Sequence, residues 1–335
     1  MRARCLDFIR CPECLGGLKL EGDWHDGYVE TGKLACVSCG KLYPIEDGIA
    51  RLLPDKQIGK FADKTRDAFS HEWLNYPGSY PEDEKIFIEE TQLDKPVWQG
   101  KTVLDAGCGM GRFTKIALSC GAEVVAIDFS ESERRLANLA RENPKLHVVQ
   151  GNLLKPPLKD GVFDIAYSIG VLHHTASARD AFCNVAKTVK SGGYFTMWLY
   201  GRAGKWSEFK TNPLRADRQN LEKIKFFVWL TVATRLFMSD FLRFFTTRLP
   251  VKAVHWLCYP VTLLGAIPGI KYLTFSVLPD FKARFFENFD WLSPPYQSHH
   301  TKEEAIVWNK ECGFEPIKIL PHGFVPKAGI LGRKL

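Results

Sequence analysis

Apolar runs and amphipathic segments alternate along the middle of the chain. Five runs rich in Val, Ile, Leu, Phe and Ala predict strands at about residues 103–105, 123–128, 146–152, 163–170 and 193–200. Helical patterns at about 112–119, 130–142 and 177–190 separate these strands. Strands that alternate with helices are typical of a parallel, doubly wound sheet. We therefore predict an α/β fold with a mostly parallel sheet over residues 101–204.

The first predicted strand runs into a glycine-rich turn. Residues 103–114 read VLDAGCGMGRFT, with glycines at positions 107, 109 and 111. Glycines at a strand-to-helix turn let the backbone approach a ligand where a Cβ would clash. A dinucleotide-binding turn would have a third glycine at position 112, which is Arg112 here. By itself the turn permits any adenosine-type ligand.

An acid ends the second predicted strand as well. Asp128 follows Asp105 by 23 residues, and a carboxylate there can take both ribose hydroxyls of an adenosine. The acid, the G-x-G-x-G turn and the strand order resemble the class I S-adenosylmethionine (SAM)-dependent methyltransferases. The arrangement D-W-x-x-P-x-Y-Q-x-x-H at 290–300 resembles a subset of the broad type 11 group of these enzymes. The resemblance implies a seven-stranded Rossmann-like sheet, with Asn152 facing the adenine. The residues it implies for SAM binding are Asp105, Gly107, Cys108, Gly109, Gly111, Asp128, Phe129, Asn152, Leu153 and Ile169. The alternatives are a nucleotide-binding fold of another purpose or a sheet without a ligand.

Two cysteine pairs stand near the amino terminus. Cys11 and Cys14, then Cys36 and Cys39, form two C-x-x-C pairs separated by 21 residues. Four thiolates in this arrangement suit tetrahedral Zn²⁺, and the closed coordination leaves no position for catalysis. The segment between the pairs is too small to hold a core without a metal. We therefore expect a structural zinc ribbon over residues 1–54, and the alternative is four buried free thiols.

The segment after the second cysteine pair, YPIEDGIARLLP at 43–54, sharpens this expectation. It resembles the small zinc-ribbon proteins that activate tRNA and protein methyltransferases, here fused to the same chain. The resemblance implies that the ribbon docks on the methyltransferase and stabilises it. Nucleic-acid binding by the ribbon is the alternative, but residues 1–54 lack the basic-aromatic cluster of single-strand binders.

Residues 55–100 are expected to form a linker and helices. Phe61, Phe69, Trp73 and Tyr76 are spaced as one face of a helix. In the methyltransferases that the chain resembles, an aromatic helix at this place folds over the cofactor. Packing against the edge of the sheet is the alternative.

Residues 205–285 read as a long apolar and basic insertion. No charged side chain occurs from 253 to 270, but Pro260 and Pro268 interrupt that window, which argues against a spanning helix. The run 226–245 suggests an amphipathic helix. We expect a helical cap on the catalytic domain. Peripheral contact with a membrane or lipid is the second possibility, and a true span the third.

The composition of the chain bears on its cellular compartment and on its partners. The chain has 335 residues, ten cysteines and a formal net charge of +7. Its first residues lack an apolar signal segment, so we expect reduced thiols and a cytoplasmic protein, with membrane association possible through 205–285. From residue 201 onward there are 20 Lys and Arg against 11 Asp and Glu. The basic surface therefore belongs to the C-terminal third, as a solvated helical face or as a contact for an anionic partner.

Residues 286–335 are expected to complete the methyltransferase domain. Thr301 and Glu304 form a capping box before a helix at 302–312, and a strand at 314–320 closes the sheet. The tetrapeptide SPPY at 293–296 matches a motif by which amino methyltransferases hold a base nitrogen. In those enzymes the motif ends the fourth strand, whereas here it comes more than a hundred residues later. Methylation of a nucleic-acid base is therefore disfavoured.

Histidines are the predicted proton acceptors. Methyl transfer from SAM is an in-line displacement, and a hydroxyl acceptor also needs a base near neutral pH. His173 and His174 follow the fourth strand, and His300 lies in the later loop. We favour His174 and His300, with Tyr296 as a hydrogen-bond partner. A structural role is the alternative for each histidine.

The predicted function is O-methylation of a small-molecule, glycan or lipid-linked acceptor. The alternatives are an RNA-directed methyltransferase and a non-catalytic SAM-binding adaptor that docks through the ribbon.

Overall fold

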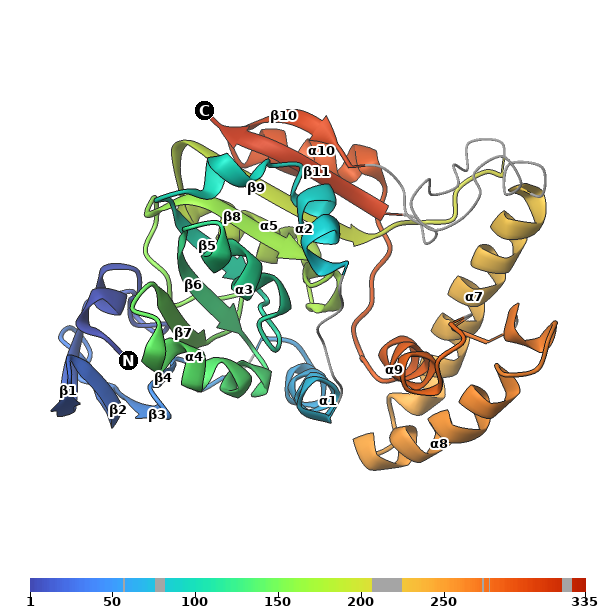
Figure 1. Cartoon of the computed structure of the whole chain (residues 1–335), viewed down its shortest axis with the longest axis horizontal. Coiled ribbons are helices and arrows are strands. Elements are labelled where there is room, and N and C mark those ends of the chain that lie inside the picture. The colour runs from blue at the N-terminus through green and yellow to red at the C-terminus, as the bar shows by residue number, and fades with distance from the viewer. Residues whose placement is uncertain (57, 76–81, 207–224, 273, 277, 321–326) are drawn as a thin grey trace.

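In the computed structural model of the chain, the described residues are 1–56, 58–75, 82–206, 225–272, 274–276, 278–320 and 327–335. Their strands form one sheet in the order β1-β2-β3-β4-β7-β6-β5-β8-β9-β11-β10 (Figure 1). The strands are β1 (Leu18–His25), β2 (Tyr28–Cys36), β3 (Leu42–Glu46), β4 (Ile49–Arg51), β5 (Thr102–Ala106), β6 (Glu123–Asp128), β7 (Leu146–Gln150), β8 (Phe163–Ile169), β9 (Val189–Tyr200), β10 (Phe314–Ile319) and β11 (Lys327–Lys334).

The strands β5 to β9 pair in parallel, as the alternation of apolar runs and helical patterns predicted. β11 pairs antiparallel with β9 and β10 with β11, which gives this part of the sheet seven strands. The whole sheet has eleven strands where the sequence predicted seven. The reason is that the amino-terminal ribbon, expected as a separate module, adds its four strands at the β7 edge.

The ribbon is joined to the parallel sheet through its last strand. β1 to β4 pair antiparallel with one another, and β4 then pairs in parallel with β7, where Ala50 faces Val149. A second bridge connects Ile9 to Leu158. Because main-chain hydrogen bonds cross the junction, the ribbon extends the sheet.

Helices cover both faces of the parallel strands. Along β6, Val125 and Ile127 belong to a core shared with α5 and α10, whereas Val124 and Ala126 face a core shared with α2, α3 and α4. This alternation is what a strand buried on both faces requires. The helices are α2 (Asp83–Thr91), α3 (Arg112–Ser119), α4 (Ala137–Glu142), α5 (Ala178–Thr188) and α10 (Lys302–Glu311), with short 3-10 turns η1 (Ala3–Asp7), η2 (Lys95–Trp98), η3 (Ser132–Leu136) and η4 (Leu172–His174).

Three long helices form a lobe beside the sheet (Figure 1). They are α7 (Lys225–Thr246), α8 (Val251–Leu264) and α9 (Phe281–Leu292), followed after α8 by the short turn η5 (Ile270–Tyr272). The lobe has its own apolar core, which includes Val232, Val254, Cys258 and Phe289. α8 continues through Pro260, which the sequence analysis took as an interruption.

The lobe corresponds to the predicted insertion, with two qualifications. The expected boundary between residues 285 and 286 falls inside α9. Residues 207–224 of the insertion, and Tyr76 of the predicted aromatic face, lie outside the described residues. None of the helices in the described ranges combines the length and apolar character needed to cross a membrane.

α1 (Ala62–Asn75) lies between the lobe and the carboxyl ends of the parallel strands (Figure 1). It packs against η3 on the side of the sheet and against α8 and α9 on the side of the lobe. Ligands of open α/β sheets bind at the carboxyl ends of the strands. α1 and the lobe therefore enclose the edge where a site is expected.

Candidate active site

Two glycines of the turn after β5 are required by close packing. Gly107 and Gly111 have φ values of +93° and +83°, in the left-handed region. A Cβ on Gly107 would lie 2.3 Å from Val171 Cγ1, and one on Gly111 would lie 2.2 Å from Leu136 Cδ2. These two glycines bring the turn against its neighbours.

Gly109, between them, has room for a Cβ. Its φ is +51°, and the nearest atoms that a Cβ would meet belong to the indole of Trp73, at 3.7 Å or more. Its backbone nitrogen donates to Asp128 Oδ2 at 2.8 Å. The indole of Trp73 on α1 thus lies over the backbone of the glycine turn at Gly109, and we call this arrangement the cradle.

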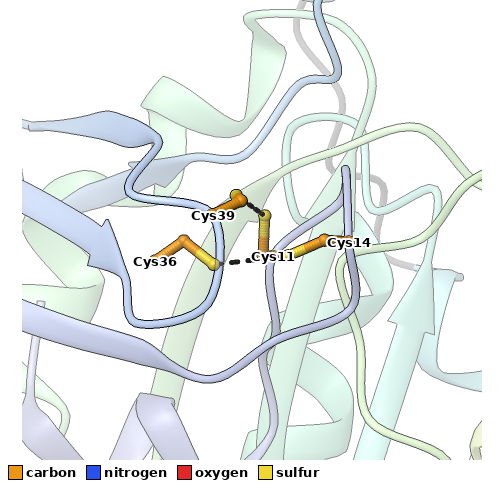
Figure 2. A group of neighbouring side chains, drawn as sticks. All are labelled: Cys11, Cys14, Cys36 and Cys39. Atoms are coloured by element: carbon orange, nitrogen blue, oxygen red, sulfur yellow. Dashed lines mark hydrogen bonds between the residues drawn. The ribbon is translucent and has the colours of Figure 1, made fainter.

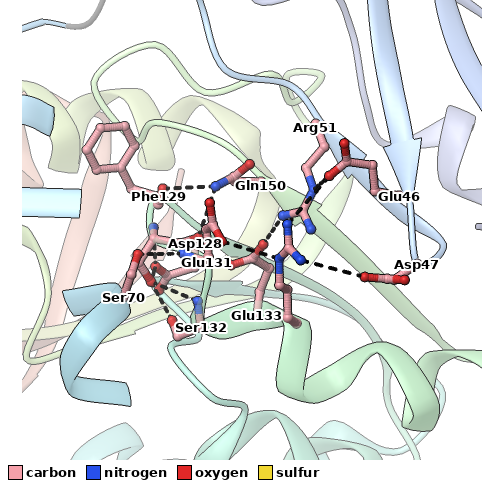
Figure 3. Close-up of polar contacts among 12 residues, drawn as sticks. Glu46, Asp47, Arg51, Ser70, Asp128, Phe129, Glu131, Ser132, Glu133 and Gln150 are labelled. Carbon is pink, nitrogen blue, oxygen red and sulfur yellow. Dashed lines mark hydrogen bonds and ion pairs between the residues drawn. The ribbon is translucent and has the colours of Figure 1, made fainter. Parts of the chain in front are cut away.

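The carboxylate of Asp128 is fixed beside this cradle (Figure 3). Besides Gly109, it accepts from the backbone nitrogen of Ser130 at 2.8 Å and from the Ser130 hydroxyl at 2.6 Å. An ionised carboxylate offers about four acceptor positions, so capacity is left for a ligand with adjacent hydroxyl groups. Ribose recognition by Asp128 stays a prediction.

Two other predicted residues lie deeper. Asp105 is buried and accepts from the Thr114 hydroxyl at 2.6 Å, and burial raises the pKa of its carboxyl to about 7. It therefore ties the start of α3 to the end of β5. The Asn152 side-chain oxygen accepts from the Leu154 nitrogen at 2.9 Å. Of the remaining predicted residues, Cys108 and Leu153 are buried, whereas Phe129 and Ile169 are partly exposed.

Sequence reasoning missed three residues that shape this site. Thr114 holds Asp105, Ser130 holds Asp128, and Gln150 donates to the backbone oxygen of Ser130 at 3.3 Å. Of these, only Ser130 carried a local signal, because a serine two residues after an aspartate often closes a turn through its hydroxyl.

The ribbon contacts the segment that follows Asp128 (Figure 3). Arg51, at the end of β4, forms a buried ion pair with Glu133 of η3. Burial and the nearby charge of Asp128 raise the pKa of Glu133 to about 8, although Arg51 opposes the rise. A more exposed pair joins Arg134 to Asp47 at 3.9 Å. The ribbon thereby supports the loop that carries the predicted ribose ligand.

The four cysteines of the ribbon meet at one point (Figure 2). The sulfur atoms of Cys11 and Cys39 are 3.8 Å apart, those of Cys14 and Cys36 are 3.4 Å apart, and all four lie within 4.8 Å of one another. Four sulfurs at about 2.3 Å from a tetrahedral Zn²⁺ would be about 3.8 Å apart. The cluster therefore fits Zn²⁺ in chemistry and in spacing.

The predicted histidines lie together at the carboxyl end of β8. His174 Nδ1 is 2.9 Å from the backbone oxygen of Tyr296, and the backbone oxygen of His173 accepts from the Ser298 nitrogen at 2.9 Å. The loop 293–300 therefore lies along η4, despite its distance in sequence. The hydroxyl of Tyr296 points elsewhere and accepts from the backbone nitrogen of Phe61 at 2.9 Å.

The histidines differ in what holds their ring nitrogens. His300 is engaged at both, with Ser298 Oγ at 2.8 Å and Glu304 Oε2 at 3.0 Å. Both ring nitrogens of His173 are buried without a hydrogen-bond partner in the described ranges. Burial lowers the pKa of His174 to about 3 and that of His173 well below its usual value. Both rings are therefore neutral at pH 7.

Two known protein families match parts of the chain. Residues 104–197 match a family described as a methyltransferase domain, of the type 11 group, and residues 2–48 match the family of Trm112p-like proteins. A 24-methylenesterol C-methyltransferase of Arabidopsis thaliana is 30% identical over 138 residues, which are 39% of this chain and 38% of that protein. A squalene methyltransferase of Botryococcus braunii is 32% identical over 104 residues, 30% of this chain and 28% of that protein. The chain thus spans well under half the length of these relatives.

Two solved structures share some similarity with the chain. A SAM-dependent methyltransferase from Mesorhizobium loti has 28% identity and a TM-score of 0.31, covering 33% of this chain and 51% of that one. A Burkholderia thailandensis 1,6-didemethyltoxoflavin-N1-methyltransferase has 15% identity and a TM-score of 0.46, covering 94% and 99%. On the strength of the family matches, the glycine turn and the sheet order, the chain contains a SAM-dependent methyltransferase domain preceded by a Trm112p-like ribbon.

Proposed function

We propose that this protein transfers the methyl group of SAM to a hydroxyl group of a small-molecule acceptor. The observation that carries the proposal is the cradle at Gly109, where the glycine turn lies under the Trp73 indole and its backbone nitrogen donates to the anchored carboxylate of Asp128. SAM would supply an already activated methyl group. The protein's own task is then to align the acceptor and exclude water.

The residues proposed for SAM surround the cradle. Asp128 would accept from the ribose hydroxyls, the backbone of Gly107 to Gly111 would border the methionine part, and Asn152 would face the adenine. Phe129, Leu153 and Ile169 would pack against the rings, and Asp105 would hold the turn from below. Cys108 would contribute its backbone, because its side chain is buried.

The residues proposed for the acceptor are the histidines around η4. His174 and His173 are neutral at pH 7 and would hold the acceptor hydroxyl by hydrogen bonds; the burial that lowers the pKa of each ring also makes it a weak base. His300 would act through the loop, because Ser298 and Glu304 hold its ring. Tyr296 would contribute its backbone oxygen, which fixes His174.

An acceptor with a lipid part is favoured by the surface of the lobe. Large apolar side chains are exposed along α7 and α8, among them Phe237 (69%), Trp256 (68%) and Phe227 (66%). Arg248 lies between these two helices in the sequence, and Lys252 is the second residue of α8. An apolar face with basic residues beside it suits peripheral contact with an anionic membrane. We therefore propose that the lobe, mainly residues 205–285, touches lipid and admits a lipid-linked acceptor.

We also propose that Zn²⁺ fills the cysteine cluster in a structural role, because four thiolates leave no open coordination position. The ribbon (1–54), the linker helices (55–100), the core (101–204), the lobe and the C-terminal strands (286–335) would then act as one unit. An RNA-directed enzyme or a SAM-binding adaptor remains the alternative.

The first experiment measures SAM binding by calorimetry and methyl transfer from labelled SAM. The acceptor panel contains hydroxyl-bearing small molecules, sterols, glycans and RNA. The Asp128→Ala variant should lose about tenfold or more in SAM affinity, because the carboxylate that receives the ribose hydroxyls is gone. Glu131→Ala, nearby and with a half-exposed side chain, should bind SAM as the unmodified protein does.

Absence of SAM binding would contradict the proposal, and methylation of RNA alone would favour the RNA-directed alternative. Unchanged affinity of the Asp128→Ala variant would remove Asp128 from the site.

A further inference from the structure

A set of aromatic and polar side chains surrounds a second position beside the glycine turn. From α1, the ring of Phe69 meets the ring of His174 at 5.0 Å. The adjacent His173 ring is 4.1 Å from the ring of Tyr200, at the end of β9. The Tyr200 hydroxyl donates to Asp290 Oδ2 on α9 at 2.9 Å. The contacts thus run from α1 through η4 and β9 to α9.

α1 also packs directly on α9, so the series of contacts from α1 through η4 and β9 to α9 forms a closed circle. The rings of His71 and Phe289 are 5.5 Å apart, and those of Trp73 and Phe286 are 5.1 Å apart. Glu72 stands between His71 and Trp73 in the sequence. It also follows Phe69 by three residues, so the two share a face of the helix. Its side chain therefore lies inside the circle.

Glu72 is an acid at a core position. The buried residues of α1 are Ala62, Thr65, Ala68 and Glu72, a helical stripe of small side chains that ends in a carboxyl group. Glu72 is fully buried, and neither of its carboxyl oxygens has a hydrogen-bond partner among the described residues. Burial and the charge of Asp290 raise its pKa well above the usual value. A buried carboxyl without a partner is costly, so a group absent from the folded chain is expected to satisfy it.

The neighbouring charges make this position acidic. Asp290 is partly accessible, and burial and the charge of Glu287 raise its pKa to about 6. The nearest basic side chain that acts on it, Arg243, is paired with Asp240 on its own helix. Two carboxyl groups therefore act on one position, and Arg243, the cation that lowers the pKa of Asp290, is paired with Asp240. Such a position suits a positively charged ligand.

We propose that Glu72 and Asp290 together bind a protonated amino group of the methyl acceptor. The inference rests on the proposed function, because it assigns this ligand to the acceptor and not to the donor. Trp73, next to Glu72, roofs the cradle at Gly109, and Val171, just before η4, packs on Gly107. An acceptor held at the carboxyl pair therefore lies beside the proposed methyl donor.

The amino group is an anchor in this arrangement and not the nucleophile, because a protonated amine has no free electron pair. The acceptor would carry an ammonium group together with the hydroxyl group that is methylated. The unpartnered ring nitrogens of His173 and the unpartnered side-chain amide of Gln297 remain for hydrogen bonds to its polar groups.

The test uses the full-length protein saturated with S-adenosylhomocysteine, and it needs no knowledge of the natural acceptor. The probe is 2-aminoethanol, which is protonated at pH 7.5, with ethylene glycol as the neutral probe of matched size and sodium chloride to equalise ionic strength. The readout is the midpoint of thermal unfolding. We expect 2-aminoethanol to raise it saturably by about 2 °C or more and ethylene glycol to leave it unchanged.

Glu72→Gln and Asp290→Asn should each lose this response. Glu72→Gln should also unfold at no lower a temperature than the unmodified protein, because it removes a buried carboxyl and keeps the shape. Asp67→Asn, on the exposed face of α1, should keep the full response. Calorimetric SAM affinity should be the same in all four proteins.

Equal stabilisation by the two probes, or an undiminished response of Glu72→Gln, would overturn the inference. So would a loss of SAM affinity in Glu72→Gln, which would assign Glu72 to the donor, or Glu72-dependent stabilisation by magnesium chloride, which would make the pair a metal site. Failure of the protein to methylate any acceptor would leave these binding results unaffected and would count against the proposed function alone.

Discussion

At the scale of single residues, the acids near the ends of β5 and β6 have different roles. Asp128 is partly exposed, and three donors of its own chain hold its carboxylate in place. Asp105 is buried, and the Thr114 hydroxyl saturates one of its oxygens. Asp105, the acid of the D-A-G-C-G motif, therefore holds the turn in shape, besides its predicted role toward the ligand.

Burial of Asp105 predicts a pH-dependent stability. Its folded pKa is about 7, above the unfolded value of about 3.8, so the native state binds more protons between these values and loses stability as pH rises through them. Asp105→Asn removes this dependence. We expect its midpoint of thermal unfolding, relative to the unmodified protein, to rise by about 2 °C or more between pH 4.5 and pH 7.5.

The measurement is thermal unfolding followed by circular dichroism at several pH values. Asp94→Asn, an exposed acid, should show a constant difference over the same range. A constant difference for Asp105→Asn as well would mean that Asp105 ionises normally in the folded protein.

At the scale of elements, β4 and α1 connect parts that the sequence presents as separate. β4 extends the parallel sheet with the ribbon, and its last residue, Arg51, reaches the buried Glu133 beside the Asp128 loop. α1 carries Trp73 toward the glycine turn and Phe69 toward His174. The ribbon and α1 therefore approach the same site from two sides.

The buried pair between the ribbon and η3 predicts a strong effect of Arg51→Met. The substitution leaves the buried Glu133 carboxyl without its partner. Because the pKa of this carboxyl is already raised to about 8, it stays mostly neutral at pH 7, and the expected loss is that of a buried hydrogen bond, about 1–3 kcal/mol of unfolding free energy. Because Glu133 follows the Asp128 loop, SAM affinity should fall as well. Denaturant unfolding and calorimetry measure the two effects.

Two variants serve as comparisons for Arg51→Met. Arg134→Met, in the exposed pair across the same junction, should cost less than about 1 kcal/mol. Arg51→Met combined with Glu133→Leu should recover most of the lost stability. Equal effects of the two single arginine substitutions would contradict a special role of the buried pair.

At the scale of the whole molecule, the protein has two lobes that meet at α1 (Figure 1). The sheet lobe carries the proposed donor site, and the helical lobe contributes Asp290 and encloses the acceptor side. The outer surface of the helical lobe exposes apolar side chains at helical spacing, such as Leu230, Phe237, Phe241 and Phe244 on α7. Arg248 stacks on Phe244 at 3.8 Å, which places a cation at the end of this face.

This face predicts binding to anionic vesicles. Vesicles of phosphatidylcholine with about a third phosphatidylserine should co-sediment with the protein, and added salt should weaken the binding. Phe237→Ser and Trp256→Ser together should reduce the bound fraction severalfold, because both side chains are more than 60% exposed. Val307→Ser, an exposed residue on α10, is the control. Absence of binding by the unmodified protein would exclude the membrane contact.

Local sequence determined the parallel core and the cysteine cluster. The strands and the α3 helix were predictable because period and turn chemistry are local properties, and α3 begins and ends where the pattern predicted. The family comparisons confirm the methyltransferase domain and the Trm112p-like ribbon. The four cysteines come together because C-x-x-C spacing already brings each pair close. The roles of single residues at the donor and acceptor sites stay predictions.

Only the tertiary structure decided which residues far apart in the sequence contact one another. The eleven-stranded sheet required the pairing of β4 with β7, which no local pattern announces. Tyr296 contacts His174 although more than a hundred residues separate them, and no local pattern predicts this contact. Glu72 carries no signal of a ligand group in the sequence, and only its burial at the contact of α1 with α9 makes it a candidate. The physical reason is that periodicity determines which face of an element is buried, whereas packing decides which other element covers that face.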